Sequence, residues 1–370
     1  MIYRVIGVMS GSSMDGLDIA FVHLHWSAGK WGYTVISAET SGYSEDWARR
    51  LKGAGDLSAR EYLLLHSAYG QYIGEEVNRF IKENDLDFKV QLVASHGHTV
   101  FHLPARGMTA QLGDGAAIAA ATGLQVVTDL RSLDVALGGQ GAPIVPIGEK
   151  LLFPGQHYFL NLGGIANISM VAGGNYTAFD VCPACGVLNL LAREKGAAYD
   201  DDGHRAASGK IIPTLLDDLN SLDYYGQPFP KSLANEFGLD QVYGMIKASG
   251  CNTEDGLCTY VEHISVQVAR AIEEQRTTRG AGKEVSGGGE MLVTGGGAHN
   301  GFLIRRLREV MEPLGITVMV PDTGLVDYKE ALIMALIGLL RMRQEENTLA
   351  SVTGARRDSI GGALWNGTDA

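Results

Sequence analysis

A turn of small and polar residues near the start of the chain, Ser10–Gly16, carries groups that could bind phosphate. Successive backbone N–H groups in a glycine-containing turn form a nest for an anion, and the hydroxyls of Ser12 and Ser13 add two donors. A carboxylate such as Asp15 or Asp18 could then hold a magnesium ion through water. The residue types at this turn therefore predict phosphate binding.

Two more glycine turns follow segments that are expected to form β-strands. Gly163-Gly164 lies between the expected strands Tyr158–Leu162 and Ile165–Val171, which repeats the order of strand, glycine turn and strand. Gly295–Gly297 follows an expected buried strand, Met291–Val293, and precedes a helical pattern. Two similar hairpins could place both glycine turns on one nucleotide. The third glycine run suits close packing against a flat adenine ring.

The elements around the first turn exclude two common phosphate-binding motifs. Tyr3–Met9 and Leu17–Trp26 read as the two strands of a hairpin. The P-loop and the dinucleotide fingerprint both need a helix directly after their glycines. The P-loop pattern G-x-x-x-x-G-K-[ST] occurs nowhere in the sequence. The pattern Gly295-x-Gly297 begins a dinucleotide fingerprint, but its third glycine, Gly301, comes one residue late.

Histidines and cysteines offer a different chemistry. The pattern His96-x-His98, with His102 four residues further on, could bind zinc and activate water beside a carboxylate. A zinc-dependent hydrolase is therefore kept as an alternative function. Cys182 and Cys185 have the spacing of a redox or zinc motif, but the other two cysteines are seven residues apart. Small buried thiols are the expectation for these residues.

Composition and length limit the classes of protein and partner that are compatible with these sites. The chain has 370 residues, 49 of them glycine, and a formal net charge of −12, which argues against a nucleic-acid partner. The length favours two domains. The longest apolar run, Ala331–Leu340, is about half of what a bilayer crossing needs, so no membrane partner is expected. No export signal is apparent after Met1, and a cytoplasmic protein is expected.

The three glycine turns, in this order, resemble the two phosphate motifs and the adenosine motif of the actin/hexokinase/Hsp70 ATPase superfamily. Within it, longer blocks are similar to the signature of the anhydro-N-acetylmuramic acid kinase family, and together they extend over nearly the whole chain. The matching blocks are Gly7–Asp18, Ser95–His102, Gln111–Asp114, Ala136–Pro143, Asn161–Asn167 and Lys329–Ala331.

The resemblance implies a kinase of cell-wall recycling that uses ATP and Mg²⁺. In the family, ATP phosphorylates O6 of 1,6-anhydro-N-acetylmuramic acid while water opens the 1,6-anhydro bond, which gives N-acetylmuramate 6-phosphate and ADP. The residues implied for the nucleotide are Gly11, Ser12, Ser13, Met14, Asp15, Gly16, Leu17, Asp18, Gly163, Gly164, Gly295, Gly296 and Gly297. Those implied for the sugar are His96, His98, Asp114, Arg131, Asp134, Gln140 and Glu330.

By the same resemblance, Asp180 is the catalytic carboxylate that activates water. It ends the expected strand Tyr176–Phe179, and its alternative role is to cap the helix that follows. The family usually reads Asp-Thr-Gly-Pro here, whereas this chain has Asp180-Val181-Cys182-Pro183. The departure leaves the sugar preference open and keeps a non-catalytic nucleotide-binding relative as a further alternative.

The expected fold is α/β, with two ribonuclease-H-like domains of the actin-like ATPase type and an active-site cleft between them. The first domain is expected to comprise residues 1–128 plus 330–370, and the second residues 129–329. The oligomeric state stays open, with a homodimer as one option.

Overall fold

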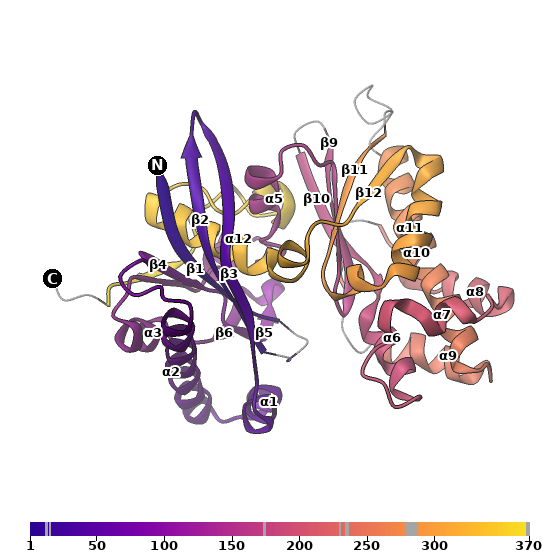
Figure 1. Cartoon of the computed structure of the whole chain (residues 1–370), viewed down its shortest axis with the longest axis horizontal. Coiled ribbons are helices and arrows are strands. Elements are labelled where there is room, and N and C mark those ends of the chain that lie inside the picture. The colour runs from indigo at the N-terminus through magenta and orange to yellow at the C-terminus, as the bar shows by residue number, and fades with distance from the viewer. Residues whose placement is uncertain are drawn as a thin grey trace. The chain divides into compact units, whose positions relative to one another are not determined.

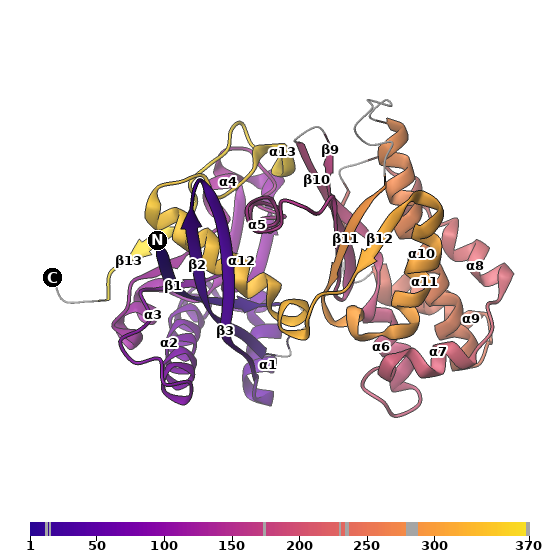
Figure 2. The same ribbon diagram turned by 45° about the horizontal axis from the view of Figure 1, so that its top comes forward.

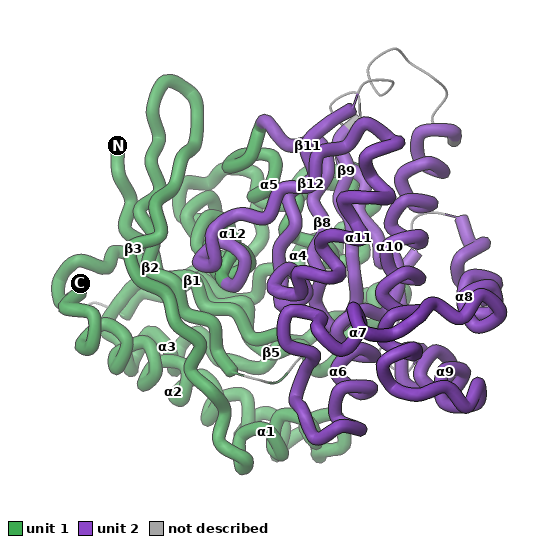
Figure 3. The backbone as a smooth tube through the Cα atoms, turned by 45° about the vertical axis from the view of Figure 1, so that its right-hand side comes forward, with its two compact units in different colours: residues 1–154, 328–370 green, residues 155–327 purple. Residues whose placement is uncertain are grey.

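The computed structural model describes residues 1–11, 14, 16–172, 175–228, 231–233, 237–278 and 288–367. The chain forms two compact units (Figure 3): unit 1 comprises Met1–Pro154 and Tyr328–Ala370, and unit 2 comprises Gly155–Asp327. The first crossing from unit 1 to unit 2 comes later than the expected boundary at residue 128. Residues 129–154, which the sequence analysis assigned to the second domain, pack with unit 1 instead.

Unit 1 is built on a six-stranded sheet with the order β13-β7-β4-β1-β2-β3. Strands β1, β2 and β3 form an antiparallel meander, β4 is parallel to β1, and β7 is parallel to β4. Strand β13 joins the far edge antiparallel to β7. The strands are β1 (Ile2–Ser10), β2 (Gly16–Ser27), β3 (Lys30–Gly42), β4 (Leu92–Ser95), β7 (Val126–Thr128) and β13 (Ala363–Trp365), and a separate hairpin pairs β5 (His98–Leu103) with β6 (Met108–Leu112).

Helices cover both faces of this sheet (Figures 1 and 2). Alternate β1 residues Ile6 and Val8 share a buried cluster with residues of α2, whereas the Cα of Gly7 faces α12. A Cβ at Gly7 would lie 1.9 Å from the Ala331 carbonyl oxygen, so only glycine allows this helix so close to the strand. The helices are α1 (Glu45–Lys52), α2 (Ala59–Glu83), α3 (Gly115–Thr122), α4 (Ser132–Ala136), α5 (Pro146–Leu152), α12 (Thr323–Arg343) and α13 (Ala350–Thr353).

Helix α12 crosses from unit 2 into unit 1 at Tyr328, where its backbone departs from helical geometry (φ −115°, ψ 15°). The apolar run Ala331–Leu340 lies in its second part, and a helix that is apolar all round is stable only when it is buried. Among the described residues, no helix is long and apolar enough to cross a membrane.

Unit 2 repeats the core of this architecture. Its sheet has the order β10-β9-β8-β11-β12, in which β8, β9 and β10 form the antiparallel meander and β11 and β12 are parallel to β8. This order matches β3-β2-β1-β4-β7 of unit 1, strand for strand. The expected α/β fold with two ribonuclease-H-like halves is confirmed. The strands are β8 (Tyr158–Leu162), β9 (Ile165–Ala172), β10 (Asn175–Pro183), β11 (Gly289–Thr294) and β12 (Ile316–Met319).

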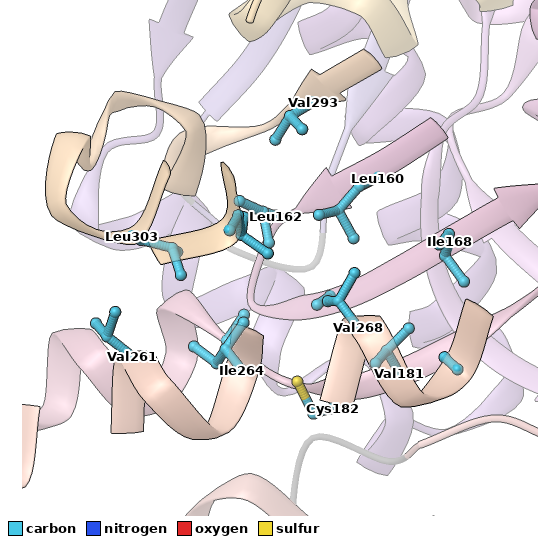
Figure 4. Close-up of a cluster of buried hydrophobic side chains, with 14 of the residues drawn as sticks. Leu160, Leu162, Ile168, Val181, Cys182, Val261, Ile264, Val268, Val293 and Leu303 are labelled. Atoms are coloured by element: carbon cyan, nitrogen blue, oxygen red, sulfur yellow. The ribbon is translucent and has the colours of Figure 1, made fainter. Parts of the chain in front are cut away.

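The core of unit 2 lies between the sheet and helices α10 and α11, where side chains from β8, β9, β10 and β11 meet those of the helices (Figure 4). Asn300 caps α11, because its side chain accepts a hydrogen bond from the Leu303 N–H. The helices are α6 (Cys185–Arg193), α7 (His204–Ser208), α8 (Pro213–Asn220), α9 (Gly244–Ala248), α10 (Thr253–Thr278) and α11 (Gly301–Met311), with short helical turns η4 (Asp223–Gly226), η5 (Phe237–Tyr243) and η6 (Gly296–His299).

Candidate active site

The first glycine turn lies where predicted, between two antiparallel strands. Ser10 at the end of β1 pairs with Leu17 in β2, so the hairpin closes directly beside the turn. Gly16 begins β2, and a Cβ there would lie 2.4 Å from the Ser41 carbonyl oxygen. Asp18 accepts a hydrogen bond from the Thr40 hydroxyl at 2.7 Å. Gly11 and Met14 are described, whereas Ser12, Ser13 and Asp15 lie outside the described residues.

The second glycine turn is tied to the start of helix α6. The Gly164 carbonyl oxygen accepts hydrogen bonds from the N–H groups of Ala184 (2.8 Å) and Gly186 (3.2 Å), and the Gly163 carbonyl oxygen accepts one from the Cys185 N–H (3.0 Å). The turn carbonyls therefore point toward the helix. This arrangement gives the turn a fixed backbone while its Cα side stays accessible.

The glycines of unit 2 fall into two groups by what surrounds them. A Cβ at Gly164 or Gly296 would meet nothing within 4 Å, so the backbone there faces open space. Gly295 has φ +82°, and its Cβ would lie 2.6 Å from the Asn161 Oδ1 atom. A Cβ at Gly297 would lie 2.7 Å from the Leu162 Cβ atom. Gly295 and Gly297 are thus required by packing, whereas Gly164 and Gly296 leave room for a ligand to approach the main chain.

Asp180 lies at a β-bulge. In the pairing of β10 with β9, Asp180 opposes Asn167 and Cys182 opposes Ala166, so Val181 is the extra residue. A bulge puts two successive residues on one face, and Val181 and Cys182 are accordingly both buried in the core. The bulge re-aims the chain at the residue that carries the carboxylate. Ala184 is the N-cap residue of α6, so the alternative role of Asp180 as that cap is not observed.

The Asp180 carboxylate is held on one side by the main chain. Its Oδ2 atom accepts a hydrogen bond from the Leu233 N–H at 2.9 Å. Burial raises the pKa of Asp180, and the Leu233 hydrogen bond opposes this rise. A carboxyl group with a raised pKa is a better proton acceptor than an exposed aspartate.

Of the cysteines near Asp180, Cys182 is buried, as expected, whereas Cys185 is partly buried. Burial raises the pKa of Cys185 to about 11 and that of Cys182 further. The Cys185 thiol donates a hydrogen bond to the Leu162 carbonyl oxygen. All four cysteines are free.

In unit 1, the buried His96 is paired with the partly buried Arg131. The Arg131 Nε–H donates to His96 Nε2 at 2.7 Å, and Nδ1 of His96 lies 2.7 Å from the Gly97 carbonyl oxygen. Nε2 therefore accepts and Nδ1–H donates, which is the neutral imidazole. Burial, and then the charge of Arg131, lower the pKa of His96 to about 3. Both ring nitrogens are bonded to the protein, so His96 does not have the free nitrogen that a zinc ligand needs.

Arg131 also fixes the glycine loop 138–143. Its Nη1–H donates to the Gly141 carbonyl oxygen at 2.6 Å. These two bonds use two of the five guanidinium N–H groups. Burial lowers the pKa of Arg131 to about 10, and the negative charge of Glu330 opposes this. The Arg131 side chain is thus partly buried and bonded to His96 and Gly141.

Asp134 in α4 and Gln140 in the glycine loop both bond to Thr353. Asp134 is buried, its Oδ2 atom accepts from the Gly141 N–H, and its Oδ1 atom accepts from the Thr353 hydroxyl, both at 2.7 Å. Its carboxylate is thus used to hold the loop. Gln140 is exposed, and its N–H donates to the Thr353 carbonyl oxygen.

His98 ends a network of hydroxyl groups that the sequence analysis did not find. Its Nδ1 atom lies 3.2 Å from the Ser10 Oγ atom, which is bonded to Tyr69 (3.0 Å) and Tyr43 (2.8 Å). Ser10 is the last residue of β1 before the first glycine turn. The network joins residues that are far apart in sequence, so no local pattern could have indicated it.

Asp114 and Glu330 complete the predicted sugar residues. Asp114 caps α3 through the Ala116 N–H at 3.0 Å. Glu330 follows the Tyr328 kink, and burial raises its pKa. Its neighbour Lys329 forms a buried ion pair with Glu149 at 3.0 Å, which the sequence analysis also missed. Among the described residues, no cluster of three or more His, Cys, Asp or Glu side chains could hold a metal ion.

Two units with one strand order, each with a glycine turn on its first hairpin, define an actin-like ATPase fold. A family model described as anhydro-N-acetylmuramic acid kinase matches residues 3–367. Proteins of that name from Streptomyces coelicolor and Shewanella amazonensis are 36% and 35% identical, over 99% and 97% of this chain and 94% and 98% of theirs. The chain belongs to the anhydro-N-acetylmuramic acid kinase family, and it is a sugar kinase.

Among solved structures, a ROK family glucokinase from Streptomyces griseus, in complex with glucose and AMPPNP, is similar over 91% of this chain and 99% of its own, with a TM-score of 0.42 and 11% identity. An activator of 2-hydroxyisocaproyl-CoA dehydratase from Clostridium difficile, with bound ADPNP, is similar over 92% of this chain and 96% of its own, with a TM-score of 0.41 and 13% identity.

Proposed function

We propose that this kinase phosphorylates O6 of 1,6-anhydro-N-acetylmuramic acid with ATP while water opens the 1,6-anhydro bond. The products are N-acetylmuramate 6-phosphate and ADP, and the reaction serves peptidoglycan recycling in the cytoplasm. The proposal rests on membership of the family together with one observation, the partly buried carboxylate of Asp180 at a β-bulge. A homodimer remains one option for the assembly.

Asp180 acts as the general base in this proposal. Water that attacks the anomeric carbon must lose a proton, and a carboxylate with a raised pKa can take it at neutral pH. As the C1–O6 bond breaks, O6 gains the electron pair and attacks the γ-phosphorus of ATP. One proton thus leaves the water, and one phosphoryl group passes from ATP to the sugar.

The sugar-binding residues of this proposal lie in unit 1. The loop held by Asp134 and Arg131 would bind the sugar. The other residues proposed for the sugar lie in the blocks that resemble the family: His96, His98, Asp114, Gln140 and Glu330. The Arg131 guanidinium, which has N–H groups beyond the two used within the protein, would bind the lactyl carboxylate. The neutral His96 accepts a hydrogen bond from this guanidinium and holds it in place, and it adds no positive charge that would repel it.

The nucleotide is assigned to the glycine turns. The first turn would hold the β- and γ-phosphates, and Gly163-Gly164 and Gly295–Gly297 would lie along the α-phosphate and adenosine. The open space at Gly164 and Gly296 fits a ligand that packs on the main chain. A magnesium ion would be held through water by Asp18, whose carboxylate oxygens are the donors Mg²⁺ prefers, and it would offset the charge of the phosphates.

Alanine substitution at the open glycines tests this assignment. Gly164→Ala and Gly296→Ala should keep the melting temperature and raise KM for ATP by about tenfold, because a methyl group would occupy the space of the nucleotide. Gly244→Ala is the matched control, since a Cβ at Gly244 also meets nothing within 4 Å but lies in α9. An unchanged KM for ATP in both variants would contradict the assignment.

The direct test of the reaction is turnover of ATP in ¹⁸O water with 1,6-anhydro-N-acetylmuramic acid as acceptor. Mass spectrometry should find one ¹⁸O atom at the anomeric position of the phosphorylated product. Phosphorylation without incorporation of ¹⁸O would show an ordinary sugar kinase. No turnover with any anhydro-sugar would favour the non-catalytic relative. The zinc hydrolase has little support, because both nitrogens of His96 are bonded within the protein.

A further inference from the structure

A short segment of unit 2, residues 231–233, lies directly against Asp180. We call it the strap. The Asp180 N–H donates to the Lys231 carbonyl oxygen at 3.2 Å, and the Leu233 N–H donates to the Asp180 carboxylate at 2.9 Å. The strap therefore bonds to β10 at Asp180, beside the bulge, and its Leu233 N–H restrains where the carboxylate points.

The Lys231 side chain fastens the strap to the rest of unit 2. Its ammonium group donates to the carbonyl oxygens of Tyr224 (3.2 Å) and Tyr225 (3.1 Å) in η4 and lies 4.8 Å from the centre of the Tyr224 ring. Burial lowers the pKa of Lys231, which is the cost of this placement. An amine held on two carbonyls and an aromatic face is a fixed anchor.

The two tyrosines are themselves fixed. The Tyr224 hydroxyl donates to the Asp180 carbonyl oxygen at 2.7 Å, so η4 and the strap hold the same residue from two sides. The Tyr225 hydroxyl is bonded to Nε2 of the buried His263 in α10 at 2.9 Å. Hydrogen bonds, joined by the main chain of residues 231–233, thus link α10 through η4 and Lys231 to the Asp180 carboxylate.

We propose that Lys231 is a positioning residue for Asp180: it holds the strap so that the Leu233 amide orients the carboxylate and favours its ionised form. The proposal rests on Asp180 being the general base. Lys231 would thus affect the reaction without contacting the reacting atoms. Tyr224, whose hydroxyl donates to the Asp180 carbonyl oxygen, would be a second positioning residue.

The effect on proton affinity has a defined sign. The titratable groups that share this surrounding are the Tyr224 and Tyr225 phenols and the Cys182 thiol, and burial raises the pKa of all three. These three groups are neutral at working pH, so their charges do not offset the effect on the pKa of Asp180 when the Leu233 hydrogen bond is lost. Without the Leu233 N–H, the pKa of Asp180 rises further, because that bond opposes the effect of burial.

The test is the pH dependence of kcat/KM in Lys231→Met. The acid limb should move up by about one pH unit, since the ionised carboxylate loses one charge-assisted hydrogen bond. Lys231→Arg should restore part of the wild-type profile, because a guanidinium can also donate to both carbonyls. Tyr224→Phe removes only the hydroxyl that donates to the Asp180 carbonyl oxygen. It should move the acid limb of the pH profile in the same direction, by a smaller amount. Lys247→Met, which removes an exposed lysine paired with Glu194, should leave it unchanged.

A second measurement does not depend on turnover. A ¹³C NMR titration of protein labelled at aspartate carboxyl groups, with the Asp180 signal assigned from Asp180→Asn, should show the same rise in Lys231→Met. A folded Lys231→Met with wild-type acid limb and titration would overturn the proposal. If that variant does not fold, Tyr224→Phe with both readouts unchanged would overturn it. Failure of the proposed function looks different, since wild-type protein would then show no ATP turnover with the anhydro-sugar.

Discussion

Asp180→Asn is expected to lower kcat by about 10²- to 10⁴-fold, the usual contribution of a positioned general base. Asparagine keeps the Oδ acceptor that bonds to the Leu233 N–H, so the strap and the bulge should stay as they are. The loss would then be chemical. The measurement is initial-rate production of ADP at saturating ATP and anhydro-sugar, with circular dichroism and a melting curve to check the fold.

Asp217→Asn serves as the matched control for Asp180→Asn. Asp217 is exposed on α8 of the same unit, and its main-chain carbonyl accepts a hydrogen bond from the Ser221 hydroxyl. It should keep wild-type kcat. Retention of more than about a tenth of wild-type kcat by Asp180→Asn would show that another group takes the proton.

Lys329→Met should destabilise unit 1 by about 3–5 kcal/mol, because it leaves the Glu149 carboxylate buried without its cation. Both side chains are 3% exposed, so water cannot replace the lost partner. Urea unfolding followed by tryptophan fluorescence is well suited to the measurement. All four tryptophans lie in unit 1, so the signal does not report on unit 2.

Two variants sharpen this experiment. Lys150→Met removes an exposed lysine from α5, one residue after Glu149, and should change the free energy of unfolding by less than about 1 kcal/mol. The double variant Glu149→Leu with Lys329→Met removes both charges and should recover most of the lost stability. If Lys329→Met alone unfolds at the wild-type urea concentration, the pair does not stabilise unit 1.

Local patterns in the sequence were enough to predict the two hairpins. The order of strand, glycine turn and strand indicated β1 with β2 and β8 with β9, and these strands pair as expected. The bulge at Val181 could not be predicted in this way, because it is a shift of register between β9 and β10. Nor could the Lys329–Glu149 pair, whose partners are 180 residues apart. The assignments of ligands to individual residues stay predictions.

The first domain boundary, expected at residue 128, could not be located from the resemblance alone, because it depends on contacts between distant residues. Residues 129–154 follow β7 and contain the loop that Asp134 and Arg131 hold. Thr353, near the end of the chain, bonds to Asp134, and this tie keeps the segment with unit 1. A partner more than 200 residues away leaves no trace in local composition.

Because α12 enters unit 1 only at Tyr328, the two units cannot be completed in the order in which they begin. Unit 2 is one continuous stretch, and all of it leaves the ribosome before residues 331–340 do. Until then, the face of β1 at Gly7, which this helix covers, has no partner. Since domains generally fold as units during synthesis, unit 2 can reach its native state while unit 1 still waits for its last helix.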